Sequence, residues 1–116
     1  MLRAGLMLTC FVLNVGLLVF SFKSRRPMWI GQSMQAIGGG LNLAVLAANS
    51  WHMPVVGDCF GNCSDGLHVQ FAPGARLPFL CDRLIFGSSV GDWLLWLGLI
   101  AIMGALLRRR WSTLNA

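Results

Sequence analysis

The sequence predicts an all-α integral membrane protein with three transmembrane helices, and two observations carry this prediction. Three long apolar stretches, residues 4–22, 27–57 and 93–107, contain no Asp, Glu, Lys or Arg, and about 20 apolar helical residues are enough to cross a bilayer. The Trp residues lie at or near the edges of these stretches, where indole rings prefer lipid headgroups. The chain is 56% hydrophobic and 11% charged, which is too apolar for a soluble domain.

The first predicted transmembrane helix covers residues 4–22 and is closed by the basic segment 23–26. A cleaved signal peptide is the alternative, because Arg3 precedes the apolar run. The run is longer than the apolar region of a typical signal peptide, and no small-residue cleavage site follows it. We therefore expect an uncleaved helix.

The second predicted helix covers residues 28–50 and carries a polar stripe of Gln35, Gly38, Asn42 and Asn49. Asn42 and Asn49 are seven residues apart, so they differ by only about 20° around a helix. An unpaired amide in hydrocarbon costs several kcal/mol. The stripe is therefore expected to face other helices or, alternatively, a ligand or a path for water.

The third predicted helix covers residues 89–107 and is followed by a tail, residues 108–116, that begins with three Arg. Ser89 and Asp92 have capping-box spacing at its start. Small residues form narrow faces on all three helices, which predict either a compact bundle or docking faces for other subunits. These residues are Gly5, Thr9 and Gly16 on the first helix, Gly38–Gly40 on the second, and Gly91, Gly98 and Ala105 on the third.

The basic residues predict the orientation in the membrane. Six of nine Lys and Arg (23, 25, 26, 108, 109 and 110) fall on one predicted side, while the other three and all four Asp fall on the opposite side. By the positive-inside rule, the N-terminus is outside and the C-terminus is cytoplasmic. Because the basic residues flank membrane segments, the net charge of +5 does not indicate a nucleic-acid partner.

Residues 51–88 are then one long extracytoplasmic loop, rich in the Gly, Asn, Asp and Pro of successive turns. Within the loop, Leu77–Phe86 has an amphipathic pattern and predicts a short interfacial helix. Cys59, Cys63 and Cys81 also fall in this loop, where disulfides can form. A disulfide among them, unpaired thiols, or a metal site completed by His68 are the three alternatives. Cys10 is expected to be a packing residue of the first helix.

Several short motifs in a fixed order resemble a known family. They are Asn42, Asn49, Met53-Pro54, His68, Asp82 and the Ser89-Val-Gly91-Asp92 helix start. In this order they resemble the small bacterial membrane proteins catalogued as domain of unknown function family 5317. The sequence departs from that pattern at Ser50, where Gly is usual, and at Cys81, where Ala is usual. The resemblance implies a bacterial inner-membrane protein and no assigned activity.

The sequence contains no nucleophile motif, phosphate-binding Gly loop or haem site. We therefore expect a non-enzymatic accessory or structural subunit without a cofactor, which packs in the lipid bilayer against other membrane-protein subunits or itself. The alternative is an extracytoplasmic-face protein that binds a metal or a lipid headgroup through His68, Asp82, Asp92 and the Cys-bearing loop. A pore formed by several copies is a third class. We also expect His68 and Asp82 to lie close to Asn49 and the start of the third helix, where they would tie the loop over the helix ends.

Overall fold

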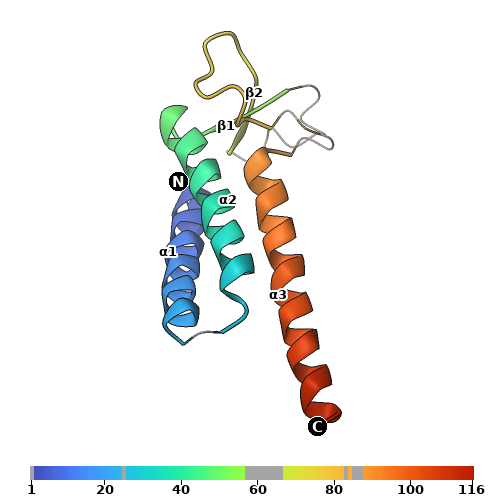
Figure 1. The fold of residues 1–116 in the computed structure, drawn as a ribbon. Coiled ribbons are helices and arrows are strands. Elements are labelled where there is room, and N and C mark those ends of the chain that lie inside the picture. Colours follow the sequence, from blue (N-terminus) through green and yellow to red (C-terminus); the bar gives the residue numbers. More distant parts are fainter. Residues whose placement is uncertain (1, 25, 57–66, 83, 85–87) are drawn as a thin grey trace.

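The computed structural model describes residues 2–24, 26–56, 67–82, 84 and 88–116 of the chain. In this part of the chain the elements are α1 (Leu2–Lys23), α2 (Trp29–Ala48), β1 (Met53–Val55), β2 (His68–Gln70) and α3 (Val90–Leu114). Helices α1 and α2 form an antiparallel hairpin, α3 runs along α2, and the two strands lie beyond the ends of α2 and α3 (Figure 1). We call the described loop residues 49–56, 67–82, 84 and 88 the cap.

The protein is mostly helical, as predicted, and two of its helices are long and apolar enough to cross a membrane. By length and composition these are Gly5–Lys23 within α1 and Val90–Leu114, which is α3. Few residues of either are buried inside the molecule. Helix α2 is not one of the two, because Gln32, Gln35 and Asn42 interrupt its apolar sequence.

Helix α3 is longer than predicted. The helix was expected to end at residue 107, before the three Arg, but it continues through them to Leu114. Arg, Leu and Trp are compatible with helix, and no Gly or Pro follows Gly104 to stop it. The predicted tail is therefore largely helical, and Figure 1 shows α3 extending past the turn between α1 and α2.

The predicted interfacial helix at Leu77–Phe86 is wrong for the residues that the structure describes there. Leu77 has a φ of 52°, and a single turn follows, in which the Leu80 N–H donates to the Leu77 carbonyl. Asp82 then pairs as an extended residue beside β1: its N–H donates to the Pro54 carbonyl and its carbonyl accepts from the Val56 N–H. A residue whose backbone is used in this way cannot continue a helix.

The cap instead contains a small parallel β-structure that the sequence analysis did not predict. Strand β1 pairs with β2 in parallel, with Met53 opposite His68 and Val55 opposite Gln70, and Asp82 pairs with β1 through Val55. The buried apolar cluster lies between the end of α2 and the cap and consists of Val45, Leu46, Met53 and Cys81. The cap is therefore packed onto the end of α2.

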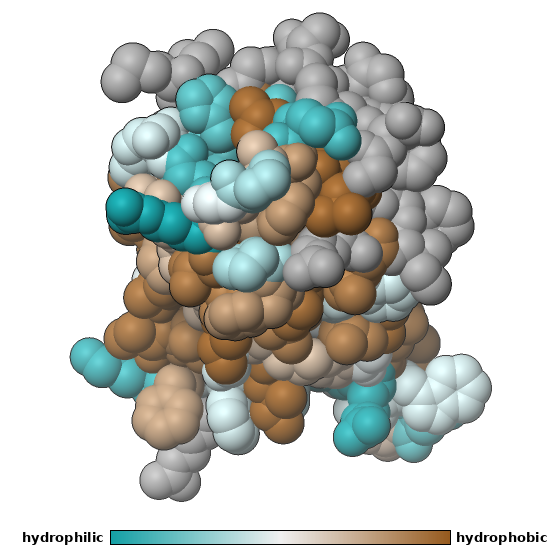
Figure 2. Space-filling view, turned by 90° about the horizontal axis from the view of Figure 1, so that it is seen from above, coloured by the Kyte–Doolittle hydropathy of each residue, from teal (hydrophilic) through white to brown (hydrophobic). Residues whose placement is uncertain are grey.

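The cap and the helices differ in the polarity of their surfaces. Seen from above, hydrophilic residues gather over the cap, while the helices below present a largely hydrophobic surface (Figure 2). Many large apolar side chains of α1 and α3 are exposed, among them Leu6, Leu13, Trp96, Ile100 and Leu107.

Candidate functional site

Helices α2 and α3 approach each other through glycines at two levels. A Cβ on Gly38 would lie 2.5 Å from the Gly91 carbonyl oxygen, and a Cβ on Gly31 would lie 2.5 Å from the Gly98 carbonyl oxygen. The two glycines are seven residues apart on each helix, so they repeat on one face. Gly91 and Gly98 were predicted to form a narrow face. Gly31 was missed, although it lies seven residues before Gly38.

The side chains of Asn42, Ser89 and Asp92 form a closed polar ring above the upper glycine contact. The Asn42 Nδ2 donates to Asp92 Oδ1 at 2.7 Å, and the Ser89 hydroxyl donates to Asn42 Oδ1 at 2.8 Å. The predicted capping box is also present: the Asp92 N–H donates to Ser89 Oγ, and the Ser89 N–H donates to Asp92 Oδ2. The α2 stripe thus faces α3 at this level, as expected for interhelical hydrogen bonding.

The polar groups of this ring are bonded to one another. Asn42 and Ser89 are buried, and both carboxylate oxygens of Asp92 accept hydrogen bonds. Gly91 belongs to the same unit, because a Cβ there would collide with Asn42 Oδ1. Asn42, Ser89, Gly91 and Asp92 are therefore joined in one structural contact between α2 and the start of α3.

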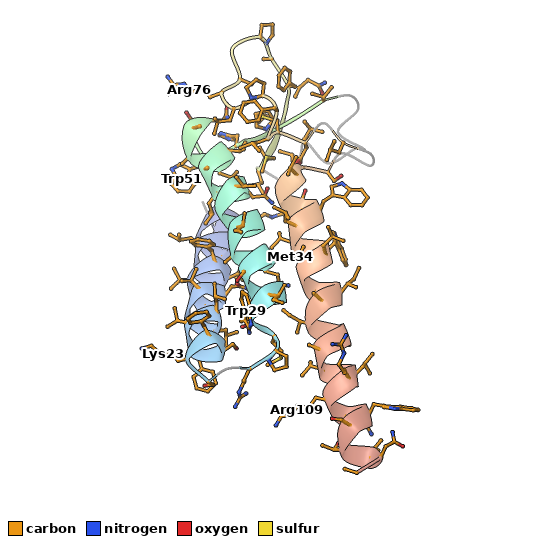
Figure 3. The ribbon with its side chains drawn as sticks, in the orientation of Figure 1. Lys23, Trp29, Met34, Trp51, Arg76 and Arg109 are labelled. Atoms are coloured by element: carbon orange, nitrogen blue, oxygen red, sulfur yellow. The ribbon has the colours of Figure 1, made fainter. Side chains whose placement is uncertain are left out.

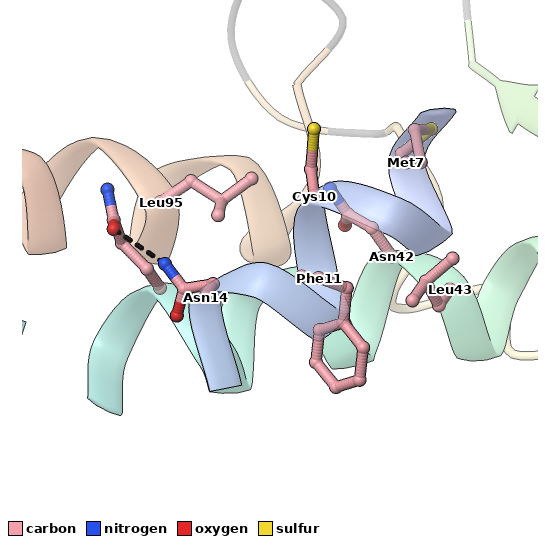
Figure 4. Close-up of a pocket in the computed structure, with 9 residues that line it drawn as sticks. Met7, Cys10, Phe11, Asn14, Asn42, Leu43 and Leu95 are labelled. Carbon is pink, nitrogen blue, oxygen red and sulfur yellow. Dashed lines mark hydrogen bonds between the residues drawn. The ribbon is translucent and has the colours of Figure 1, made fainter. Parts of the chain in front are cut away.

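A cavity of about 210 Å³ lies lower in the bundle, between α1, α2 and the side of α3 (Figure 4). One hydrogen bond crosses its edge: Asn14 Nδ2 of α1 donates to Gln35 Oε1 of α2 at 2.9 Å. The other oxygen, Asn14 Oδ1, is buried and has no hydrogen-bond partner in the described part of the chain. Asn14 was not singled out by sequence, although an amide inside an apolar run was a visible signal. The remaining lining is mostly apolar and includes Met7, Cys10, Phe11, Leu43 and Leu95.

Asn49 fastens the cap to the end of α2 through the backbone of Arg76. Asn49 Nδ2 donates to the Arg76 carbonyl at 2.9 Å and also to the Val45 carbonyl. The Arg76 N–H donates to Asn49 Oδ1 at 2.8 Å. One amide side chain thus satisfies both backbone groups of a loop residue. Sequence reasoning selected Asn49 but expected His68 and Asp82 to lie near it, and it did not identify Arg76.

His68 and Asp82 come together in the cap. His68 Nε2 lies 3.5 Å from Asp82 Oδ2; the His side chain is partly exposed, whereas the Asp side chain is almost fully buried. Burial and, to a smaller extent, the negative charge of Asp92 raise the pKa of Asp82 from 3.8 to about 6, while His68 opposes both effects. Asp82 Oδ1 has no hydrogen-bond partner among the residues that the structure describes. His68 and Asp82 therefore form one pair in the cap, and the Asp82 carboxyl can take up a proton as the pH falls through about 6.

The cysteine predictions fall partly outside the described residues. Cys59 and Cys63 lie outside the residues that the structure describes, so neither a disulfide nor a metal site with them is described. Cys81 is buried, and its thiol lies 3.4 Å from the Leu77 carbonyl oxygen. Among the described residues no group of three His, Cys, Asp or Glu side chains could hold a metal ion. Met53 and Pro54 are buried in β1 and serve the packing and pairing of the cap.

The sequence matches no family model, no curated protein and no solved structure. The resemblance to domain of unknown function family 5317 therefore remains a prediction.

Proposed function

We propose that this chain is a small polytopic protein of the bacterial inner membrane that acts as a non-enzymatic accessory subunit and packs against other membrane helices. The observation that carries the proposal is the closed ring of Asn42, Ser89 and Asp92. Its polar groups bond to one another and stabilise the bundle, so they are not available to bind a reactant. The exposed surface that remains on the helices is largely apolar.

The face of α1 that carries Gly5, Thr9 and Gly16 is the best candidate for a partner helix. A Cβ added at Gly5 or Gly16 would meet nothing within 4 Å, so this narrow face does not serve packing inside the bundle. Thr9 lies between them and is exposed, with its hydroxyl donating to the Gly5 carbonyl. Small residues on an exposed helix face allow close approach of a second helix in a membrane.

In this proposal α2 is the third membrane span, shielded by its neighbours. Its 20 residues correspond to about 30 Å of helix, close to the hydrocarbon thickness. Two of its polar side chains, Gln35 and Asn42, bond to α1 and α3 respectively. Gln32 differs, because its Oε1 is buried without a hydrogen-bond partner in the described part of the chain. The two bonded amides lower the cost of placing α2 in hydrocarbon despite its modest hydropathy.

The distribution of charge supports a cytoplasmic C-terminus and an outer cap. Lys23 and Arg26 border the turn between α1 and α2, and Arg108–Arg110 lie on the same end of α3. The described acidic side chains, Asp82 and Asp92, lie at the cap end. This separation follows the positive-inside rule.

Photo-crosslinking tests the proposed partner face. A photoreactive amino acid at Val12, on the Gly5–Gly16 face of α1, should give a discrete crosslinked protein band in native membranes. The matched control is the same amino acid at Ile100 of α3; both positions are about equally exposed, and Ile100 should react mainly with lipid. A chain that purifies alone in mild detergent, with equal and diffuse crosslinking at both positions, contradicts the proposal.

Labelling of single cysteines in a Cys-free background tests the orientation. A membrane-impermeant reagent applied to intact cells should label position 72 in the cap and leave position 112 unlabelled. The reverse pattern would refute the orientation, and labelling of neither position before lysis would contradict an outer cap joined to a cytoplasmic C-terminus by α3.

A second candidate function is cation or headgroup binding at the cap, and a specific observation favours it. The almost fully buried Asp82 carries one unpartnered oxygen beside His68. Asp92 was expected to share this role, but its oxygens are occupied by Asn42 and Ser89. Elemental analysis of purified protein should then find a divalent metal that is lost in both H68A and D82N. Metal-free wild-type protein from metal-supplemented cells would exclude this metal site.

A further inference from the structure

A groove of about 820 Å³ opens between the start of α2 and the far end of α3. On α3 its lining residues follow one helical face, at spacings of three and four: Ala101, Gly104, Ala105, Arg108, Arg109 and Ser112. This face continues the one that carries Gly91 and Gly98, which pack on α2. Helix α2 begins at Trp29, so the C-terminal part of this α3 face extends past the start of α2.

The groove is apolar along its length and cationic at its rim. Pro27, Trp29, Ile30 and Gly31 form the α2 wall. Arg108 and Arg109 lie near the open end, and Figure 3 shows the Arg109 side chain on the side of α3 that faces the other two helices. A Cβ at Gly104 would meet nothing within 4 Å, so space remains along the floor.

The positive charge at this end is not neutralised by side chains of the described part of the chain. Lys23, Arg26 and Arg110 add to the two Arg of the groove, while the described acidic residues lie at the opposite end, in or next to the cap. Helix α2 also begins here without a side-chain hydrogen bond from its N-cap residue, Met28. The positive end of the α2 dipole borders the groove, while the C-terminal ends of α1 and α3, which carry the opposite partial charge, lie at the same end of the molecule.

We propose that this groove binds one anionic phospholipid, with the phosphate against Arg108 and Arg109 and an acyl chain along Ala101, Gly104 and Ala105. The proposal rests on the membrane location proposed above. An apolar channel that ends in two Arg matches an acyl chain joined to a phosphate, and basic pockets between helices at the cytoplasmic surface suit anionic headgroups. Charge selects the lipid over a partner helix, because an apolar helix offers nothing to bond the two guanidinium groups.

Native mass spectrometry of the full chain tests the site, after exchange into detergent with phosphatidylglycerol or with phosphatidylcholine of identical chains. Wild type should retain one phosphatidylglycerol and little phosphatidylcholine. The R108Q/R109Q variant should lower this occupancy about fivefold or more. The K23Q/R110Q variant is the matched control, since it removes the same two charges from the same end without altering the lining of the groove, and it should behave as wild type.

The G104F variant tests the apolar part of the groove. Phe at this position would occupy the floor without displacing a neighbouring atom near its Cβ, so lipid occupancy should fall although all charges remain. Excess inorganic phosphate should not displace the bound lipid, because phosphate lacks the acyl chain.

Three results would overturn the lipid site: equal loss in R108Q/R109Q and K23Q/R110Q, full retention in G104F, or displacement by phosphate. Wild type that retains both lipids equally would also overturn it. Cell fractionation separates this failure from failure of the proposed function. Protein recovered in the membrane fraction without a selective lipid contradicts only the lipid site, whereas protein absent from the membrane fraction contradicts both.

Discussion

Helix α2 is held on its two sides by different means. Toward α3, two levels of glycine bring the backbones together, and the buried ring of Asn42, Ser89 and Asp92 closes the contact. Toward α1, Phe11 packs near Gly39 and Gly40, and Asn14 contributes one hydrogen bond to Gln35. In lipid, where no hydrophobic force joins helices, close packing and hydrogen bonds determine association. The α2–α3 pair is therefore the fixed part of the molecule, and α1 is the more weakly attached helix.

The largest expected effect comes from adding one methyl group to the α2–α3 contact. In Gly91→Ala the new Cβ collides with Asn42 Oδ1 and with the Gly38 carbonyl, so the helices must separate. We expect a loss of about 3 kcal/mol in the free energy of unfolding, at the upper end for overpacked sites. Denaturation of purified protein in mixed micelles measures it.

The matched control for Gly91→Ala is Gly16→Ala on α1, where a Cβ meets nothing. This change should leave stability the same or raise it by less than about 1 kcal/mol, because Ala is the better helix former. If the two variants were equally destabilised, the difference between the two sides of α2 would be refuted.

Removal of the Asn42 amide should lower the free energy of unfolding by less than Gly91→Ala does. It should lower it by more than removal of the Asn14 amide on α1. Asn42→Leu leaves Asp92 Oδ1 and the Ser89 hydroxyl without their partner, which costs about 2 kcal/mol for buried groups. Asn14→Leu removes the single bond to Gln35 and should cost about 0.6 kcal/mol, the average for membrane helices. Comparable losses measured in the same unfolding assay would show that α1 is bound as firmly as α3.

The pH dependence of stability should reveal the effect of burying the Asp82 carboxyl in the cap, to which the charge of Asp92 adds. The folded pKa of Asp82 is raised to about 6, so the folded protein holds this proton more tightly than the unfolded chain does. This contribution to stability is complete below about pH 4 and is lost as the pH rises through 6. The raised pKa corresponds to at most about 3 kcal/mol, and solvent screening reduces this to about 1–2 kcal/mol.

Asp82→Asn should therefore unfold with little pH dependence between 4 and 7, and near pH 7 it should be at least as stable as wild type. Unfolding curves across this range provide the measurement. A wild-type protein whose stability rises with pH over the same interval would contradict the raised pKa.

The most local expected effect concerns the attachment of the cap to α2. Asn49→Ala removes both bonds to the Arg76 backbone and should cost about 1 kcal/mol. Hydrogen exchange at the Arg76 amide should accelerate while exchange in α3 stays unchanged. Asn49→Asp keeps an acceptor for the Arg76 N–H but has no donor for the Arg76 carbonyl, so the Arg76 amide should exchange at an intermediate rate. Exchange identical to wild type in both variants would show that this contact does not hold the cap.

The helices could be predicted from sequence because their signals are local. Apolar runs, the Ser89–Asp92 spacing and the stripe at Asn42 all lie within a few turns of one helix. The end of α3 does not follow from the position of the Arg residues, because Arg has good helix propensity and the helix continues through residues 108–110.

The cap could not be predicted in the same way because its partners are distant in sequence. Strand β1 pairs with β2 some fifteen residues later, and Asp82 joins from further along the chain. The amphipathic spacing within Leu77–Phe86 indicated a helix, but backbone bonds from Asp82 to β1 decided the conformation. Asn49 was found by its polarity, while its partner is the backbone of Arg76, which no side-chain pattern reveals.

The separation of the ring residues along the chain sets an order of assembly. Helices α1 and α2 are joined by a short turn, while residues 49–89 lie between α2 and α3, and closing the longer connection costs more conformational entropy. The hairpin of α1 and α2 therefore forms first, with Asn14 bonded to Gln35. In the proposed membrane topology, Asn42 remains without Ser89 and Asp92 until α3 docks, in hydrocarbon that penalises an unpaired amide. In the proposed membrane topology, docking of α3 is therefore the step that satisfies Asn42 and completes the ring.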